Sequence, residues 1–222
     1  ATTGGTNNTT LFSTAGGTAA SSGAAVAITV GNTITFPAET GTNIGNYNTV
    51  LSCLAGGGAT ANTLSGTNGQ VSNTLVIGAG DSGKAIVCTY TNTRKTATLT
   101  LRKTWAASSI AGNTTTVTSS GFTNNASSGL STATAIGNTT TGSAVTVYAG
   151  ESGTISEAFG VGSASNYNAV LTCTGNATAL VGNALTVNSA DSAIVCTYTN
   201  TKIAGNTIQG KVFFDNGKGT AT

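Results

Sequence analysis

The stretch that decides the fold is present twice, as Asn46-Tyr47-Asn48-Thr49-Val50-Leu51-Ser52-Cys53 and as Asn166-Tyr167-Asn168-Ala169-Val170-Leu171-Thr172-Cys173. A second cysteine-containing stretch is duplicated as well, as Ala85-Ile86-Val87-Cys88-Thr89-Tyr90-Thr91-Asn92-Thr93 and Ala193-Ile194-Val195-Cys196-Thr197-Tyr198-Thr199-Asn200-Thr201. A fixed internal period is typical of an array built from one folding unit. Two units of about 100 residues, the usual size of a domain, fit the chain. We place them at residues 1–95 (module 1) and 96–202 (module 2), followed by a tail at 203–222.

The composition argues against several classes of function. Only 6% of residues are charged and the net charge is +2, so the chain has no electrostatic footprint for nucleic acid or for an anionic membrane. No apolar stretch approaches the roughly 18 residues of a transmembrane helix. Histidine is absent, which rules out a Ser-His or Cys-His pair. We therefore expect neither an enzyme nor a cofactor or metal site, although Asp215–Gly219 faintly resembles a calcium loop without its later ligands.

The four cysteines fall two in each copy, at matching positions. Their neighbours are apolar and no CxxC pair is present, which argues against a metal site. Four cysteines permit three pairings, but only Cys53–Cys88 with Cys173–Cys196 respects the repeat. We therefore predict one disulfide per module and an oxidising compartment that is secreted, periplasmic or cell-surface.

Apolar and polar residues alternate in the repeated stretches, and no segment shows a helical period. Alternation places one set of residues on a single strand face in each copy: Ile86, Cys88, Tyr90 and Asn92, and Ile194, Cys196, Tyr198 and Asn200. Hairpins are also predicted around a turn at 150–153 and, in the first copy, between residues 26–30 and 34–36. Short strands separated by Gly- and Asn-rich turns predict an all-β fold of two tandem Ig-like β-sandwiches.

The two copies are unequal at their beginnings. Module 2 opens with a strand that ends at Lys103-Thr104-Trp105, followed by a second strand around residues 114–118. Module 1 has no counterpart of residues 96–119, because its residues 7–15 already match 124–133. A sandwich without its opening strand exposes an apolar groove and unpaired backbone.

The tail carries a surplus strand. It follows Thr201 just as the opening strand of module 2 follows Thr93. We predict that residues 206–215 act as a donor strand that enters module 1 of a neighbouring molecule. The residues that would fill the groove are Ile208, Gly210, Val212, Phe213 and Phe214. Head-to-tail strand addition of this kind generates filaments when it does not close a ring. The alternative is that the chain belongs to a longer array and that the tail begins a third domain.

Three short motifs of module 2 resemble one family of bacterial surface-protein repeats. They are Lys103-Thr104-Trp105, Ile155-Ser156-Glu157 and Tyr198-Thr199-Asn200-Thr201. With them, module 2 resembles the collagen-adhesin B-type (Cna-B, prealbumin-like) β-sandwich. The tail segment 208–217 is similar to the opening of serine-aspartate-repeat B-type domains. The resemblance implies a prealbumin-like sandwich at the bacterial cell surface.

The same resemblance implies a cross-link in module 2. In that family a lysine of the first strand and an asparagine of the last can form an isopeptide bond, assisted by a buried acid. The matching residues are Lys103, Asn200 and Glu157. Such chemistry needs a neutral lysine, whose pKa falls on burial. The alternative is a solvated Lys103, an Asn200 that caps or joins the ladder, and a Glu157 on a turn. Because disulfides already brace the modules, this alternative is the one we favour from sequence.

In module 1 the resemblance matches Asn92 and Glu39 but finds no lysine on an opening strand. Lys211 of an incoming tail would supply it, which would make the bond intermolecular. Our functional expectation is accordingly a structural subunit of an extracellular bacterial filament, whose principal partner is another copy of itself. The alternative is a set of stalk repeats in a large adhesin that contacts host or surface ligands elsewhere.

Overall fold

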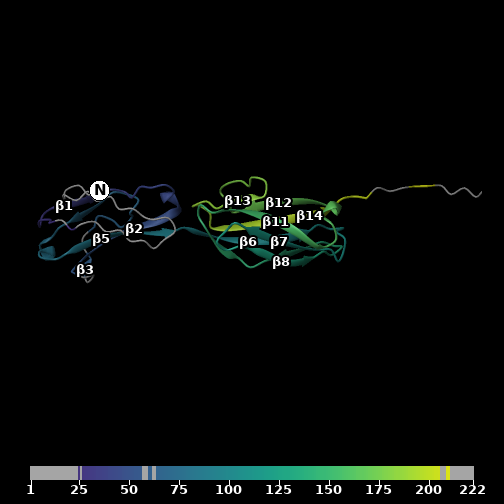
Figure 1. Ribbon diagram of the computed structural model, residues 1–222, viewed down its shortest axis with the longest axis horizontal. Coiled ribbons are helices and arrows are strands. Elements are labelled where there is room, and N and C mark those ends of the chain that lie inside the picture. The colour runs from purple at the N-terminus through teal and green to yellow at the C-terminus, as the bar shows by residue number, and fades with distance from the viewer. Residues whose placement is uncertain (1–24, 26, 57–59, 62–63, 206–208, 211–222) are drawn as a thin grey trace, which may run out of the picture.

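The computed structural model describes residues 25, 27–56, 60–61, 64–205 and 209–210, which form two β-modules lying end to end (Figure 1). Module 1 contains β1 (Thr33–Phe36), β2 (Tyr47–Ala55), β3 (Thr60–Ala61), β4 (Asn73–Val76) and β5 (Ile86–Arg94). Module 2 contains β6 (Thr96–Trp105), β7 (Thr114–Ser120), β8 (Ser127–Thr132), β9 (Asn138–Thr141), β10 (Val145–Tyr148), β11 (Ser152–Val161), β12 (Tyr167–Thr174), β13 (Ala184–Thr186) and β14 (Ala193–Lys202). The described helices are single 3-10 turns, at Ile44–Asn46, Ala79–Asp81 and Ala164–Asn166. None of the described helices could cross a membrane.

Module 2 is a complete sandwich of two sheets. One sheet has the order β10-β6-β14-β12, with β9 also paired to β6, and the other has the order β13-β11-β7-β8. The first strand, β6, lies parallel to the last strand, β14. Every second residue of β6 is buried, as the alternation predicts: Ala97, Leu99, Leu101, Lys103 and Trp105. Ala97, Leu99 and Leu101 meet Val117, Ile155, Leu185 and Ile194 in one apolar core. Trp105 packs in a separate cluster with Ala133 and Tyr167.

Both predicted disulfides are confirmed. Cys53 on β2 lies directly opposite Cys88 on β5, and Cys173 on β12 lies opposite Cys196 on β14. Each bond therefore joins neighbouring strands of one sheet and ties the last strand of its module to the strand beside it. In the loop-entropy model such cross-links contribute about 3–4 kcal/mol each.

The two predicted hairpins are wrong. β10 pairs with β6, whereas β11 pairs with β7 and β13, so the turn at 150–153 passes from one sheet to the other. Of the predicted hairpin in module 1 only the second strand forms, as β1, and residues 27–30 are not in a strand. Ile28 and Val30 are 37% and 44% exposed. Residues 27–30 lack a pairing strand. β10, their counterpart in module 2, pairs with β6, and no described segment of module 1 takes the place of β6.

Module 1 is smaller, and one strand edge is open within its described part. Its sheets have the orders β3-β2-β5 and β1-β4 around a core of Ile34, Phe36, Leu51, Cys53, Leu75 and Ile77. Among the described residues β5 pairs only with β2, whereas the equivalent β14 pairs with β12 and β6. As a result Ile86, Cys88 and Tyr90 are only half-buried, although their counterparts on β14 are buried.

The junction between the modules is a fixed contact, because only Lys95 separates β5 from β6. The Lys95 amide donates to Asn46 O at 2.8 Å, and the Ala149 amide donates to Lys95 O at 2.9 Å. Arg94 Nε also donates to Ala149 O, at 3.0 Å. Gly150 adopts φ +83° here, a conformation that favours glycine, and a Cβ on it would lie 2.6 Å from Asn46 Nδ2, so that the Asn46 side chain would have to move.

The end of module 2 repeats this local geometry. The Ile203 amide donates to Asn166 O at 2.9 Å, just as Lys95 binds Asn46. The chain leaves module 2 at the end opposite to module 1 (Figure 1). Of the predicted donor strand, residues 206–215, only Gln209 and Gly210 lie among the described residues, and neither is in a strand. The others lie outside them: Ile208, Lys211, Val212, Phe213 and Phe214.

Candidate functional site

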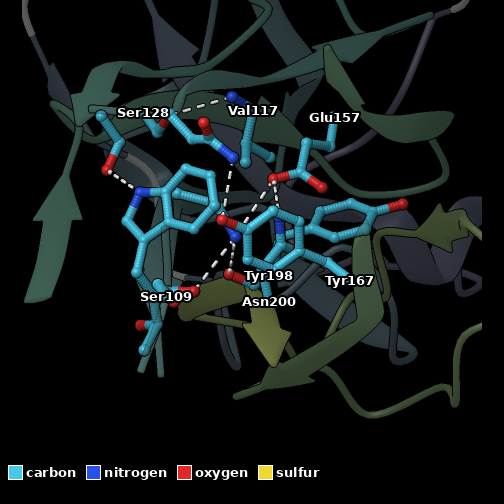
Figure 2. Close-up of polar contacts among 12 residues, drawn as sticks. Ser109, Val117, Ser128, Glu157, Tyr167, Tyr198 and Asn200 are labelled. Carbon is cyan, nitrogen blue, oxygen red and sulfur yellow. Dashed lines mark hydrogen bonds and ion pairs between the residues drawn. The ribbon is translucent and has the colours of Figure 1, made fainter. Parts of the chain in front are cut away.

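Three polar residues meet inside module 2, each from a different strand. Lys103 comes from β6 and Asn200 from the adjacent β14, while Glu157 reaches across from β11 in the opposite sheet. The register pairs Lys103 with Tyr198, so Asn200 lies two residues further along the same face. Lys103 and Asn200 are fully buried, and the Glu157 side chain is 6% exposed. Figure 2 shows the Glu157 carboxylate turned towards Asn200.

One carboxylate oxygen contacts both nitrogens of the cluster. Glu157 Oε1 lies 3.1 Å from Lys103 Nζ and accepts a 3.0 Å hydrogen bond from Asn200 Nδ2. Lys103 Nζ also donates to the backbone oxygens of Thr104 and Tyr198, at 3.0 and 3.4 Å. Asn200 Oδ1 is buried and has no hydrogen-bond partner among the described residues. No described hydrogen-bond donor therefore engages the side-chain carbonyl of Asn200.

Aromatic rings cover this cluster. Lys103 Nζ lies 4.4 Å from the centroid of the Trp105 ring, a distance at which the ring stabilises a cation. Trp105 packs edge-on against Tyr167 and Phe159, with centroids 5.2 and 6.0 Å away. The Tyr167 hydroxyl is held by a 2.9 Å hydrogen bond from Asn113 Nδ2. The rings shield the cluster from solvent. One signal for this cover is present in the sequence, because Tyr167 belongs to the duplicated stretch; no comparable signal points to Phe159.

Burial changes the chemistry of the lysine. It lowers the pKa of Lys103 from 10.5 to about 8, against the opposing charge and hydrogen bond of Glu157. About one-tenth of such amines are neutral at pH 7 and half at pH 8. The favoured expectation of a solvated Lys103 and a Glu157 on a turn is thus wrong, because both residues lie in strands and face the core. A neutral amine, an amide carbonyl and a carboxyl group that contacts both nitrogens are the groups needed to exchange one amide for another.

Module 1 contains the same pair without the lysine. Asn92 Nδ2 donates to Glu39 Oε1 at 2.9 Å, and Thr49 Oγ1 donates to Asn92 Oδ1 at 2.5 Å. Glu39 Oε2 is buried and has no hydrogen-bond partner among the described residues. Asn92 is exposed, whereas Asn200 is fully buried. The two residues that the resemblance matches in module 1, Glu39 and Asn92, are therefore in contact, and Lys211 lies outside the described residues.

Metal binding finds no support among the described residues, which contain no group of three potential His, Cys, Asp or Glu ligands. The calcium-loop-like segment Asp215–Gly219 lies outside them.

Comparison with known proteins gives one result that covers almost the whole chain. A sequence family described as a prealbumin-like fold domain, of the SpaA type, matches residues 1–94 and again residues 97–202. The boundary between the two matches falls at the junction around Lys95. No curated protein matches the chain.

Proposed function

The chain belongs to the prealbumin-like fold domain family, of which it contains two copies, and from this premise we propose that it is a structural subunit of an extracellular bacterial filament. In this proposal the subunits join head to tail, and residues 206–215 of one molecule add to the β5 edge of module 1 in the next. The observation that carries it is that edge: β5 pairs only with β2 among the described residues, and its inward face is half-exposed. An unpaired edge beside an apolar face is a template for an added strand.

We further propose that module 2 is locked by an amide between Lys103 and Asn200. The neutral Lys103 Nζ attacks Asn200 Cγ, and the new Nζ–Cγ bond replaces the Cγ–Nδ2 bond. Glu157 Oε1 contacts both nitrogens and passes the proton from Nζ to Nδ2, so that ammonia leaves. No oxidant or cofactor is needed to balance this step.

The position of the lock suits a protein that carries tension. β6 and β14 are the first and last strands of module 2 and lie side by side. Tension that enters at Lys95 and leaves at Ile203 runs through these two strands. An amide between them would transmit the load directly and leave the rest of the sandwich unstretched. Mechanical resistance, rather than catalysis on a substrate, is the role that this placement supports.

A stalk of adhesin repeats is the second candidate, and the junction favours it. The contacts of Ala149 with Lys95 and Arg94 hold the modules end to end, and the contact of Lys95 with Asn46 fixes where the chain leaves module 1. The matching contact of Ile203 with Asn166 fixes the exit from module 2 in the same way and would orient a further domain. In a stalk the tail begins the next domain and donates nothing to another molecule.

Sedimentation of the full chain and of a chain truncated before Ile203 separates the two candidates. The filament proposal expects concentration-dependent polymers from the full chain and monomers from the truncated chain. Electron microscopy of the polymers should show a continuous thread of modules. Monomers from both chains at high concentration would refute strand donation and leave the stalk.

A further inference from the structure

We propose that module 1 is an acceptor that becomes covalently linked, through Asn92, to a lysine on a strand supplied by another molecule. The inference rests on the strand-accepting half of the proposed function and adds the chemistry of the occupant. That occupant is an extended segment whose lysine lies on the same face as its apolar residues.

The first support is the carboxylate of Glu39. In module 2 the equivalent carboxylate of Glu157 contacts both Asn200 and Lys103. In module 1 Glu39 Oε1 contacts Asn92, but the buried Oε2 has no hydrogen-bond partner among the described residues. A buried carboxylate oxygen without a partner is unfavourable. An ammonium or amine group delivered to this oxygen would satisfy it.

The second support is the strand edge beside this carboxylate. Asn200 is fully buried, whereas Asn92 is exposed. We attribute this difference to β6, which pairs with β14 and has no described equivalent beside β5. A strand added parallel to β5 would complete the backbone pairing of the sheet and cover Ile86, Cys88 and Tyr90 together. Both the hydrogen-bonding edge and the half-buried face are therefore complementary to a strand of the β6 kind.

The register of module 2 specifies which residues such a strand must carry. Lys103 is opposite Tyr198, and Trp105 is opposite Asn200. Transferred to module 1, this register sets the incoming lysine opposite Tyr90 and an aromatic residue opposite Asn92. Two and four positions before the lysine the strand needs apolar residues, as Leu101 and Leu99 are in β6.

The lysine has to come from outside module 1. Residues 1–83 contain none. Lys84 follows the turn that ends at Asp81, and Lys95 Nζ is engaged at the junction, where it donates to Gly45 O at 2.9 Å. Lys103 is held by Glu157 inside module 2.

The chain's own tail meets this requirement only in part. Lys211 follows Asn200 at the same spacing as Lys103 follows Asn92. Side chains alternate between the two faces of a strand, however, so Lys211 faces away when Ile208, Val212 and Phe214 face the core. The tail is thus suited to non-covalent addition, whereas a strand with the pattern of β6 is suited to the covalent link.

The bond-forming step balances without a further reactant. A neutral lysine Nζ attacks Asn92 Cγ, the Cγ–Nδ2 bond breaks, and ammonia leaves. Glu39 transfers the proton from Nζ to Nδ2. Thr49 Oγ1 already donates to Asn92 Oδ1 and would stabilise the negative charge that develops on this oxygen. Module 2 has Ala169 at the position of Thr49, so this hydrogen bond is particular to module 1.

The test uses three synthetic peptides and the full chain at a dilution where it is monomeric. One peptide has the sequence of residues 96–105, the second carries Lys103→Arg in that sequence, and the third has the sequence of residues 206–215. We expect the first to give an adduct whose mass is that of protein plus peptide less about 17 Da for the lost ammonia. Fragment spectra should locate the link at Asn92. The second and third should bind without an adduct.

Glu39→Gln is the matched control in the protein. It keeps the size of the side chain and the edge of β5, so binding of the first peptide should persist. Adduct formation should slow at least about 100-fold, the usual loss when an acid–base group is removed. An adduct that forms at the same rate would show that Glu39 has no part in the reaction and would overturn the inference.

The remaining outcomes separate this inference from the proposed function. Binding of the first peptide without an adduct would refute the covalent link and leave strand acceptance intact. An adduct at another residue, or one formed through Lys211 of the third peptide, would refute the site or the face argument. Absence of binding by all three peptides would refute both the acceptor and the filament. Filaments of the full chain, together with a first peptide that gives no adduct, would refute this inference alone.

Discussion

The Lys103–Asn200 lock can be tested by replacing the group that moves the proton, with Glu157→Gln. The cross-link would close a loop of about 100 residues, which in the loop-entropy model is worth about 4.7 kcal/mol. For a domain of this size each kcal/mol shifts Tm by roughly 4–8 °C. We therefore expect Glu157→Gln to lower the Tm of module 2 by about 20 °C or more. Intact mass should show that the wild type, unlike the variant, has lost ammonia.

A second pair of variants separates the lock from the ion pair that Glu157→Gln also removes. Lys103→Met leaves Glu157 buried without its cation, and loss of one partner of a buried pair costs about 3–5 kcal/mol. The double variant Lys103→Met with Glu157→Gln removes both charges, and such replacements are often neutral or stabilising. If an ion pair alone holds the site, the double variant should therefore melt near the wild type. If the amide is present in the wild type, the Tm of the double variant should stay well below that of the wild type. A wild-type mass without ammonia loss, together with recovery in the double variant, would refute the lock.

Three other predictions follow from the same contacts. The first concerns module 2 refolded before the amide forms, in which the rate of ammonia loss should rise about tenfold per pH unit up to pH 8 and then level off. This profile is expected because the pKa of Lys103 is lowered to about 8 and only its neutral form reacts. A rate that falls with pH over this range would contradict the assignment. Tyr167→Phe leaves the buried Asn113 amide without its 2.9 Å partner. It should lower the unfolding free energy of module 2, measured by urea denaturation, by about 1–3 kcal/mol. No change would show that water or another group replaces the hydroxyl. Arg94→Ala removes the hydrogen bond to Ala149 O. It should widen the distribution of inter-module angles in small-angle scattering, while the Tm values of module 1 and module 2 stay the same. An unchanged distribution would mean that the backbone contacts alone fix the junction.

Much of the fold was predictable because the duplicated stretches encode local pairing. Matching cysteines in two copies selected one disulfide pattern, and the structure has Cys53 opposite Cys88 in that pattern. The hairpin predictions failed for a different reason. Alternation tells which residues face the core but not which strand lies alongside, and β10 pairs with β6 from far earlier in the chain rather than with its sequence neighbour β11.

The site was predicted in part. Family resemblance brought Lys103, Glu157 and Asn200 together correctly, but the favoured interpretation left the lysine in solvent. The contrary signal was present in the sequence, since Lys103 continues the inward series of Leu99 and Leu101. The favoured interpretation rested on the disulfides that already brace each module, but a disulfide does not decide which face of its strand Lys103 occupies, whereas the local period of two does. The charge is tolerated in the core because Glu157 and two backbone oxygens bind it.

The Glu39–Asn92 pair of module 1 is difficult to explain by stability alone. A buried ion pair is weak evidence for stability even when it is complete, and here only the acid half is present. Thr49 satisfies Asn92 Oδ1, yet Glu39 Oε2 keeps a buried position without a partner among the described residues. Replacing Glu39 with an apolar residue of similar volume should therefore stabilise an isolated module 1. The same replacement should destabilise module 1 once a lysine-bearing strand occupies β5. Opposite signs in the two states, measured by urea unfolding with and without the peptide of residues 96–105, would identify Glu39 as a residue kept for its partner. Destabilisation in both states would instead make it an ordinary member of the module 1 core.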